Sequence, residues 1–354
     1  MRHAYAMMRY TRGFSLVEMM VAVTIGLIIL AAVSGIFVTS KSTYNTTDSL
    51  ARLQENARFA VHYLQYPLRM AGYYGCLKDI RSVASTVNGT TFSTAALQIP
   101  IDALKPSEPK WYPSTSTALP TGTGWTYRSG TAAILIRTTD PSLNITIREL
   151  MPSTSRELKV TGVTGLSSGD IIMLADCSSA DLLQLTAVQT PANHLQHNTG
   201  AGTTPGNFTA ELQKQYDVGA KIIKFKSSTY FIATRTLDGV PVLMRQDNTD
   251  PAVELIEGVE DLQIRYGVDT DSDGVPNIYL KAGDAGLSTA TDWTKVRAVR
   301  IGLLMRTLIG KEEYTNSETY LVLDKSITAP GDRHHRRVFN FTLQLRNLNG
   351  EVAL

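Results

Sequence analysis

The sequence predicts an α+β fold, in which one long amino-terminal helix packs on a head domain of mostly antiparallel strands. Three observations lead to this prediction. Twenty consecutive residues without a formal charge run from Met19 to Val38, an apolar stripe at helical spacing follows them, and the periodicity beyond Cys76 is that of short strands. With 354 residues, 43% of them hydrophobic, the chain is long enough to bury a sizeable core.

The uncharged run has the length of a membrane span. As a helix it extends about 30 Å at ~1.5 Å per residue, which matches the hydrocarbon core of a bilayer. The alternative is a cleaved secretory signal, with a basic start and Ala32-Val33-Ser34 as its cleavage site. Glu18 argues against that alternative, because a carboxylate at the centre of a membrane helix costs roughly 2.5–3.5 kcal/mol.

A second helical segment follows the span without a break. Its apolar residues recur at spacings of three and four, namely Leu50, Leu53, Ala57, Val61, Leu64 and Leu68. This pattern places one apolar stripe on a helix, so we expect the span and the stripe to form one element of about fifty residues. Pro67 is expected to end or kink it, because proline lacks a backbone N–H donor and clashes with the preceding turn.

The head is predicted from short β-rich runs bounded by turn residues. These runs are residues 132–136, 144–148, 170–174, 221–226, 230–234, 262–266, 296–306 and 338–345. Two stretches rich in Pro, Gly, Ser and Thr, residues 105–124 and 190–207, are interpreted as long loops. We expect a mostly antiparallel β domain that packs against the amphipathic half of the helix.

The segment Arg12-Gly13-Phe14-Ser15-Leu16-Val17-Glu18, followed by the apolar run, resembles the class III leader of type IV prepilins and of type II secretion pseudopilins. The resemblance implies that prepilin peptidase cleaves between Gly13 and Phe14 and that Phe14 is N-methylated. It also implies four parts: a leader at 1–13, a transmembrane and filament-core helix at 14–38, an amphipathic continuation at 39–75, and a β-rich head at 76–354. That architecture is pilin-like.

Further segments are similar to PilW-type minor pilins. They are residues 56–60, 68–76, 258–269, 296–301 and 336–339. The resemblance implies a minor pilin of the type IV pilus, in the tip or priming complex that starts assembly, with roles in twitching motility, adhesion or DNA uptake. Its partners would be prepilin peptidase and other minor and major pilins. The protein would cross the inner membrane once, with its head in the periplasm, and then join the pilus on the cell surface.

Two other functions remain open from the sequence. The first is a pilus-tip adhesin or DNA-binding module, and the second is a pseudopilin of a type II secretion system. The near-neutral charge of +2 gives no general support to nucleic acid as a partner. For the adhesin or DNA-binding module, two surfaces are candidates. One is the basic run Arg333-His334-His335-Arg336-Arg337, and the other is formed by the aromatic residues Trp111, Tyr112, Trp125 and Tyr127.

Glu18 is expected to act in assembly. After cleavage it would be the fifth residue of the mature chain. An intramembrane carboxylate avoids an unpaired charge by forming an ion pair, and its expected partner is the amino terminus of an adjacent subunit. Protonation by desolvation is the alternative, which would weaken that pairing.

The two cysteines, Cys76 and Cys177, fit neither a zinc cluster nor a redox pair. Export to the periplasm favours a disulfide between them, which would join the end of the helix to the end of the strand at 170–174. Two buried free thiols are the alternative.

The segment Asp269-Thr270-Asp271-Ser272-Asp273-Gly274 resembles the first half of a calcium-binding loop. Asn277 is a further candidate oxygen ligand, whereas Leu280 stands where the usual glutamate would be. The alternative is an acidic hairpin, since Asp and Gly favour turns.

No catalytic site is predicted. Gly165-Leu166-Ser167-Ser168-Gly169 matches the GxSxG pattern of hydrolases, but a strand-like run follows it where a helix is required, so we interpret it as a turn. His194 and His197 have no cysteine or carboxylate at metal spacing nearby in the sequence. The chain is therefore predicted not to be an enzyme and to require no cofactor, apart from structural Ca²⁺ as the one candidate.

Overall fold

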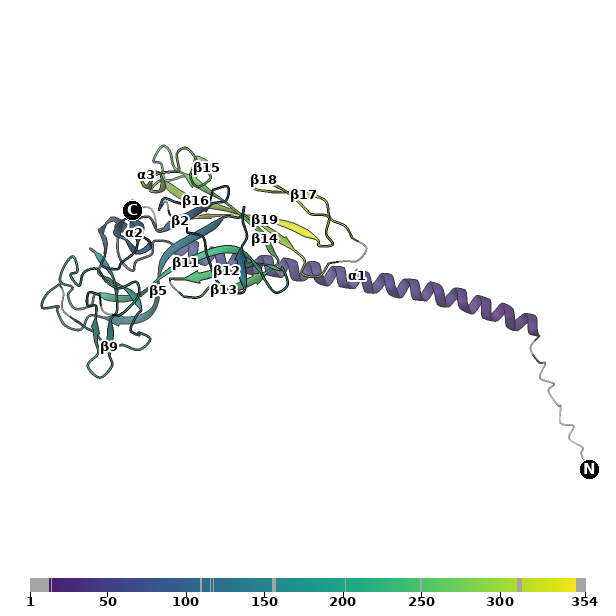
Figure 1. Ribbon diagram of the computed structural model, residues 1–354, viewed down its shortest axis with the longest axis horizontal. Helices are drawn as coiled ribbons and strands as arrows, with labels where there is room; N and C mark the ends of the chain where they lie inside the picture. The colour runs from purple at the N-terminus through teal and green to yellow at the C-terminus, as the bar shows by residue number, and fades with distance from the viewer. Residues whose placement is uncertain are drawn as a thin grey trace, which may run out of the picture. The chain divides into compact units, whose positions relative to one another are not determined.

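The computed structural model describes residues 13, 15–108, 110–114, 116, 118–154, 157–200, 202–248, 250–310 and 314–347. Its contacts divide the chain into two units, Met1–Ala51 and Arg52–Leu354. One 55-residue helix, α1 (Leu16–Met70), contributes residues to both units (Figure 1). The remaining regular structure is mostly antiparallel strands, which confirms the predicted α+β class.

We divide α1 into a first part, residues 16–51, and a second part, residues 52–70, and no residue of the first part is buried. The first part contains a stretch that is long and apolar enough to cross a membrane, and none of that stretch is buried within the protein. Hydroxyl groups within the helix donate to its own backbone: Thr24 to the carbonyl of Val21 at 2.9 Å and Thr39 to that of Gly35 at 3.0 Å. These bonds satisfy the hydroxyl groups without any partner outside the helix, which lowers the cost of placing them in lipid.

The second part of α1 buries one stripe, formed by Leu53, Ala57, Ala60, Leu64 and Leu68. The helix continues through Pro67 and ends at Met70, five residues before the limit predicted from the sequence. The backbone of Gly72 and Gly75 takes positive φ angles of 72° and 75°, a conformation that ends helices and that glycine adopts without a steric penalty.

The larger sheet follows the strand order β1-β8-β7-β11-β5-β2-β3; in addition, β12 and β4 pair with β11, and β13 pairs with β12. Its strands are β1 (Val83–Ser85), β2 (Ile101–Lys105), β3 (Lys110–Tyr112), β4 (Trp125–Tyr127), β5 (Ala133–Thr146), β7 (Ile171–Ala175), β8 (Ala180–Gln184), β11 (Lys221–Arg235), β12 (Pro241–Asp247) and β13 (Val253–Glu257). All its pairings are antiparallel except that of β1 with β8.

Three smaller sheets complete the head. A four-stranded sheet has the order β15-β14-β16-β19, with β14 (Val259–Val268), β15 (Ile278–Leu280), β16 (Val296–Arg306) and β19 (Arg336–Gln344). A three-stranded sheet contains β6 (Leu158–Lys159), β10 (His194–Gln196) and β9 (Ala187–Gln189), and a hairpin contains β17 (Thr319–Val322) and β18 (Lys325–Thr328). The short helices are η1 (Ile80–Ser82), η2 (Thr90–Phe92), α2 (Thr94–Gln98) and α3 (Ala290–Trp293).

The main core lies between α1 and two sheets. The buried stripe of α1 packs with inward residues of the larger sheet, such as Ile134 and Ile232, and of the four-stranded sheet, such as Leu262 and Ile301. A separate apolar cluster fills a lobe formed by β6, β7, β8, β10 and the start of β11. The two stretches interpreted as long loops each contain a short strand, β3 and β10, so that interpretation is wrong in part.

Candidate functional site

The start of α1 is closed by two reciprocal hydrogen bonds. The backbone N–H of Glu18 donates to Ser15 Oγ at 3.2 Å, and the N–H of Ser15 donates to Glu18 Oε2 at 3.3 Å. This is a capping box, in which two side chains satisfy N–H groups that the first turn of a helix leaves unpaired. This role of Ser15 is not among the sequence-based predictions, although the Ser-x-x-Glu spacing signals it.

The carboxylate of Glu18 therefore already has one function within its own chain. It lies at the positive end of the helix dipole, where a negative charge is favoured. Both Gly13 and Glu18 are exposed. Phe14, the predicted site of cleavage and methylation, lies outside the described residues.

Cys76 and Cys177 form a disulfide with a Cα–Cα distance of 4.8 Å. Cys76 follows the end of α1, and Cys177 lies in the turn between β7 and β8. Next to it, Asp176 accepts from the backbone N–H groups of Ser178 and Ser179, each at 2.9 Å, and pairs with Lys214. Burial opposes ionisation of Asp176, but these donors lower its pKa, so the turn that holds the disulfide keeps its charge. The disulfide thus ties the helix end to the larger sheet.

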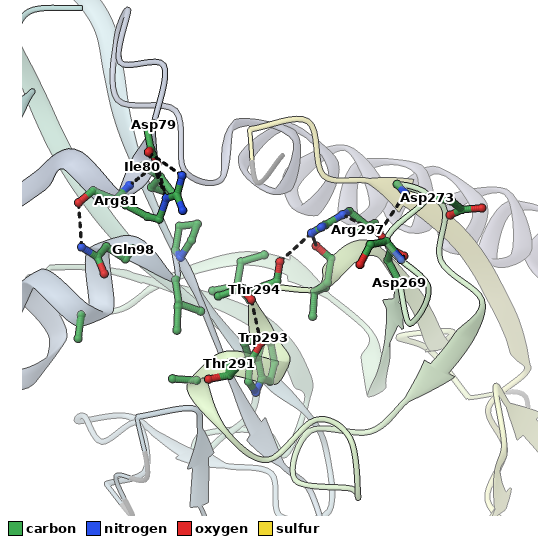
Figure 2. A pocket seen from close by; sticks show the side chains of 18 residues that line it. Asp79, Ile80, Arg81, Gln98, Asp269, Asp273, Thr291, Trp293, Thr294 and Arg297 are labelled. Atoms are coloured by element: carbon green, nitrogen blue, oxygen red, sulfur yellow. Dashed lines mark hydrogen bonds and ion pairs between the residues drawn. The ribbon is translucent and has the colours of Figure 1, made fainter. Parts of the chain in front are cut away.

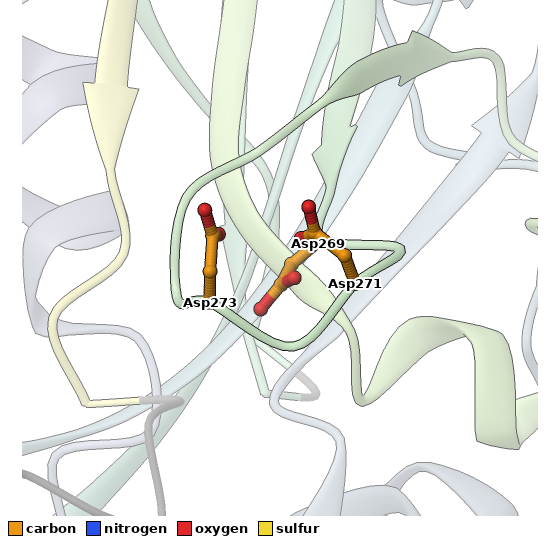
Figure 3. Close-up of side chains that lie close together, drawn as sticks. All are labelled: Asp269, Asp271 and Asp273. Carbon is orange, nitrogen blue, oxygen red and sulfur yellow. The ribbon is translucent and has the colours of Figure 1, made fainter.

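The structure brings the three predicted calcium ligands Asp269, Asp271 and Asp273 together (Figure 3). One carboxylate oxygen of each lies within 4.8 Å of the other two. Asp269 is buried at the end of β14, whereas Asp271 and Asp273 are exposed. Asn277 lies beside them, since its amide donates to Asp271 Oδ2 at 3.0 Å.

The oxygens of this loop also accept protein hydrogen bonds. Asp269 accepts from the N–H groups of Ser272 at 2.7 Å and Gly274 at 3.0 Å, and Arg297 Nε lies 3.4 Å from it. Burial opposes ionisation of Asp269, but these N–H groups and Arg297 lower its pKa. Asn277 Oδ1 accepts from the N–H of Thr270 at 2.8 Å. The loop is thus an ordered acidic turn, whose carboxylate and amide oxygens are of the type that Ca²⁺ prefers.

A cleft of about 880 Å³ adjoins this loop. Asp79, Arg81 and Gln98 lie on one wall, and Thr294, Arg297 and Asp273 belong to the other (Figure 2). Charges on each wall are paired locally: Arg81 with Asp79 at 2.9 Å and Arg297 with Asp269. The described lining contains no histidine or cysteine, so it offers no nucleophile activated by a neighbouring imidazole.

The basic run at residues 333–337 does not form a continuous basic surface. Arg336 is buried, with its Nε 2.5 Å from Glu260 and its Nη2 2.5 Å from Asp332. Arg336 lowers the pKa of Asp332 to about 2, and burial together with Arg306 lowers the pKa of His334. The interpretation of the run as an exposed patch is wrong for Arg336, which leaves Arg333 and Arg337 as its exposed cations.

The aromatic residues considered as an adhesive surface are buried or half-buried in the head. Trp111 and Tyr112 are buried, and Trp111 Nε1 donates to the carbonyl of Ala118 at 2.7 Å. Trp125 packs on Phe231 with ring centroids 5.0 Å apart. Trp111 and Tyr112 therefore belong to the core, whereas Trp125 and Tyr127 are half-buried and pack against it.

The remaining sequence motifs have structural roles. Gly165 and Gly169 adopt positive φ angles of 85° and 93° in a turn that leads into β7, in agreement with the interpretation of the GxSxG motif as a turn. His194 Nδ1 lies 3.3 Å from Glu157 Oε1, and His197 is buried. In the described parts of the chain, the acidic loop is the one cluster with metal-ligand spacing.

Comparison with known proteins agrees with the resemblance seen in the sequence. Residues 229–347 match the family model of the type IV pilus-assembly protein W, and residues 8–34 match the prokaryotic N-terminal methylation motif. The first match covers β12 to β19 and the second covers the start of α1, which confirms the predicted resemblance to PilW-type pilins.

Comparison of the chain with curated proteins and with solved structures adds little to these two matches. No match is found among curated proteins. A type IV-like pilin from Thermus thermophilus is 14% identical over 52% of this chain and 87% of its own, with a TM-score of 0.20, which is too low to support an argument. On the evidence of its two motifs and its long apolar helix, the chain is a type IV pilin-like protein with a PilW domain and a prepilin motif.

Proposed function

We propose that this protein is a minor pilin, which prepilin peptidase cleaves between Gly13 and Phe14 and which then enters the priming complex at the tip of a type IV pilus. The observation that carries the proposal is α1 itself. It is one helix whose first part is exposed and apolar and whose second part packs in a head with a PilW domain. The methylation motif at residues 8–34 supports the processing step.

The exposed apolar side chains require a non-aqueous environment at every stage. Each fully exposed Leu, Ile or Val would gain about 1.5–3 kcal/mol on burial. Before assembly, that environment is the inner membrane, which α1 crosses once with the head in the periplasm. After cleavage, it is the bundle of helices contributed by other minor and major pilins. The proposal assigns the protein no catalytic role and no required cofactor.

In the assembled state, Glu18 pairs with the amino terminus at Phe14 of an adjacent subunit. A carboxylate surrounded by apolar helices is stable only with a cationic partner or as the neutral acid. The exposure of Glu18 supports this role, because its second carboxylate oxygen remains available beside the hydrogen bond from Ser15. The capping bond holds the carboxylate at the end of the helix.

Deletion of the gene tests the assembly role. We expect loss of surface pili and of twitching motility, with recovery on re-expression of the full chain. Normal piliation in the deletion strain would refute the proposal. Loss of protein secretion with normal piliation would instead identify a pseudopilin of a type II secretion system.

Variants at the start of α1 distinguish the effect of the capping hydrogen bonds from the effect of the negative charge of Glu18. Glu18→Gln keeps a carbonyl oxygen for the bond from Ser15 but removes the charge, whereas Ser15→Ala removes the hydroxyl and keeps the charge. We expect normal processing in both variants, and impaired incorporation into pili for Glu18→Gln alone. Glu55→Ala, which removes an exposed carboxylate from the second part of α1, serves as the matched control. Equal incorporation of Glu18→Gln and the wild type would exclude the ion pair.

A ligand-binding function of the head predicts a different result. Neutralising the exposed Arg333 and Arg337 would then abolish binding of DNA or of a surface ligand while piliation stays normal. The buried position of Arg336 reduces the support for this alternative, because a variant at that residue would disturb folding.

Calcium binding by Asp269, Asp271, Asp273 and Asn277 stays a prediction. Isothermal titration of the full chain in detergent with Ca²⁺ tests it. The wild type is expected to give heat of binding and a higher unfolding temperature, and Asp271→Asn is expected to give neither. Absence of both signals in the wild type would exclude the site.

A further inference from the structure

The outer edge of β19 is longer than the other outer edges in the described sheets. β19 spans nine residues and forms one end of the four-stranded sheet. The edge strands β1, β3, β4, β9 and β15 span three residues each, and β13 spans five. A long edge matters because it presents a row of backbone donors and acceptors that another chain can pair with.

Alternate residues of β19 direct these backbone groups away from the sheet. Leu345 N–H donates to the carbonyl of Arg297, and Thr307 N–H donates to that of His335, so odd-numbered positions pair with β16. The outward groups therefore belong to Val338, Asn340, Thr342 and Gln344. Within the described residues, β19 pairs with β16 alone, and no other backbone hydrogen bond reaches these four positions.

The hairpin of β17 and β18 covers a face of this sheet and leaves the edge open. A Cβ atom placed on Gly302 would lie 2.8 Å from Val322 Cγ1 and 2.9 Å from Leu323 Cγ, so the hairpin lies over the face of β16, and β17 also contacts β19. Gly302 is the register partner of Asn340. Even so, Asn340, Thr342 and Gln344 remain exposed.

This edge also lacks the features that protect edges from pairing. The segment Val338–Gln344 contains no charged residue and no proline, and its register with β16 has no bulge. The edge strand β13 differs, because its Glu254 and Glu257 form ion pairs with Arg235 at 2.7 Å and 2.5 Å. The contrast between the unprotected edge of β19 and the protected edge of β13 supports a pairing role for β19.

The charges around the edge indicate what kind of strand it would accept. Arg337 and Arg346 are exposed at its two ends, and the exposed Arg300 donates to Thr342 Oγ1 at 3.3 Å. None of these three arginines forms an ion pair with a described residue. Acidic residues at the ends of an incoming strand would meet these cations, whereas its middle would face an uncharged segment.

We propose that the outer edge of β19 accepts an extended strand from another protein, uncharged in its middle and acidic at its ends, which adds a fifth strand to the sheet. The main-chain hydrogen bonds hold the strand, and the flanking arginines set its position. The site lies in the head, so its occupancy can be measured without pilus assembly.

A synthetic peptide tests the proposal with the full chain in detergent. The peptide is nine residues long, as β19 is, and alternates valine and threonine with a glutamate at each end. We expect it to bind and to slow amide hydrogen exchange at Val338, Asn340, Thr342 and Gln344. Exchange at Phe339 and Phe341, whose N–H groups already bond to β16, is expected to stay unchanged. Absence of binding, or equal protection at all these amides, would overturn the proposal.

Proline variants and a charge-reversed peptide provide the controls. Asn340→Pro removes one outward N–H without removing a bond to β16, and it should weaken peptide binding about tenfold, as the loss of one or two net hydrogen bonds predicts. Thr342→Pro is the second variant, and tryptophan fluorescence checks the folding of both. A peptide with lysines at its ends should bind more weakly. If the proline variants fold and still bind the peptide as the wild type does, the edge of β19 is excluded as the binding site. If the wild type forms dimers and Asn340→Pro abolishes them, the strand that occupies the edge comes from a second copy of this chain instead.

Discussion

The two parts of α1 belong to one helix but differ in where their apolar residues lie. In the first part, apolar side chains such as Ile28 and Phe37 surround the helix and are exposed. In the second part, they form one stripe, and Leu64 and Leu68 on it are fully buried. A helix that is apolar all round is suited to lipid or to a bundle, whereas a striped helix packs on a folded domain. The comparison shows that the distribution of apolar residues, more than their number, decides which surroundings a helix segment needs.

Truncation of one leucine in the striped part should have the largest effect on the head. Leu64→Ala leaves a cavity between α1 and the sheets, and we expect the free energy of unfolding to fall by about 2–5 kcal/mol. Ile28→Ala, in the first part, should change it by less than about 0.5 kcal/mol. Chemical unfolding of the full chain in detergent, followed by tryptophan fluorescence, measures both. Since all three tryptophans (Trp111, Trp125 and Trp293) lie in the head, equal shifts for the two variants would contradict the comparison.

Removal of the disulfide should have the next largest effect. It closes a loop between residues 101 positions apart, and the double variant Cys76→Ala with Cys177→Ala should lose about 2–4 kcal/mol of head stability. The helical signal of the first part should persist in far-ultraviolet circular dichroism. Reduction of the wild type provides the control and should reproduce the loss. An unchanged unfolding midpoint after reduction would show that the disulfide does not stabilise the head.

A change of pH should also act on the head rather than on the first part of α1. Burial raises the pKa of Asp181 from 3.8 to about 6, although it accepts from the hydroxyl of Tyr216 at 2.9 Å. A raised pKa means that the folded state binds more protons, so head stability falls as the pH rises from about 4 to about 6, by on the order of 3 kcal/mol. Asp181→Asn should remove this pH dependence, and Glu211→Gln, an exposed acid, should not. The difference between the unfolding midpoints of variant and wild type across that range measures the effect.

Loss of the helix cap should have the smallest effect and should be confined to the first part. Ser15→Ala removes the acceptor for the N–H of Glu18, which should cost about 1 kcal/mol and let the first turn open more often. Faster amide exchange at Glu18 and Met19, with an unchanged unfolding midpoint of the head, is the expected outcome. A shift of that midpoint would mean that the two parts are coupled.

Much of the fold could be predicted because the signals are local. The stripe from Leu53 to Leu68 repeats every three or four residues, and the acidic loop from Asp269 to Asp273 is contiguous in sequence. The same holds for the prepilin segment, whose residues stand together. The helix ends at Met70, before the predicted limit at residue 75, because the left-handed conformation of Gly72 depends on how the chain turns into the head.

Other features could not be predicted because their partners are distant in sequence. Arg336 is surrounded by basic residues in the sequence, yet it is buried against Glu260, 76 positions away. Trp111 stands in a stretch rich in turn residues, yet β3 pairs with β2 and buries it. Local composition describes what a segment prefers, whereas such burial depends on which strands meet.

By itself, the sequence determined the apolar helix with its prepilin motif, the continuation of that helix as a striped segment, and the acidic loop. These features arise from residues close together along the chain, where spacing alone sets which side chains share a face. Tertiary structure alone decided the paired charges around Arg336, the burial of Trp111 and the open edge of β19. Each of these depends on strand order and burial, which bring together residues that no short-range pattern connects.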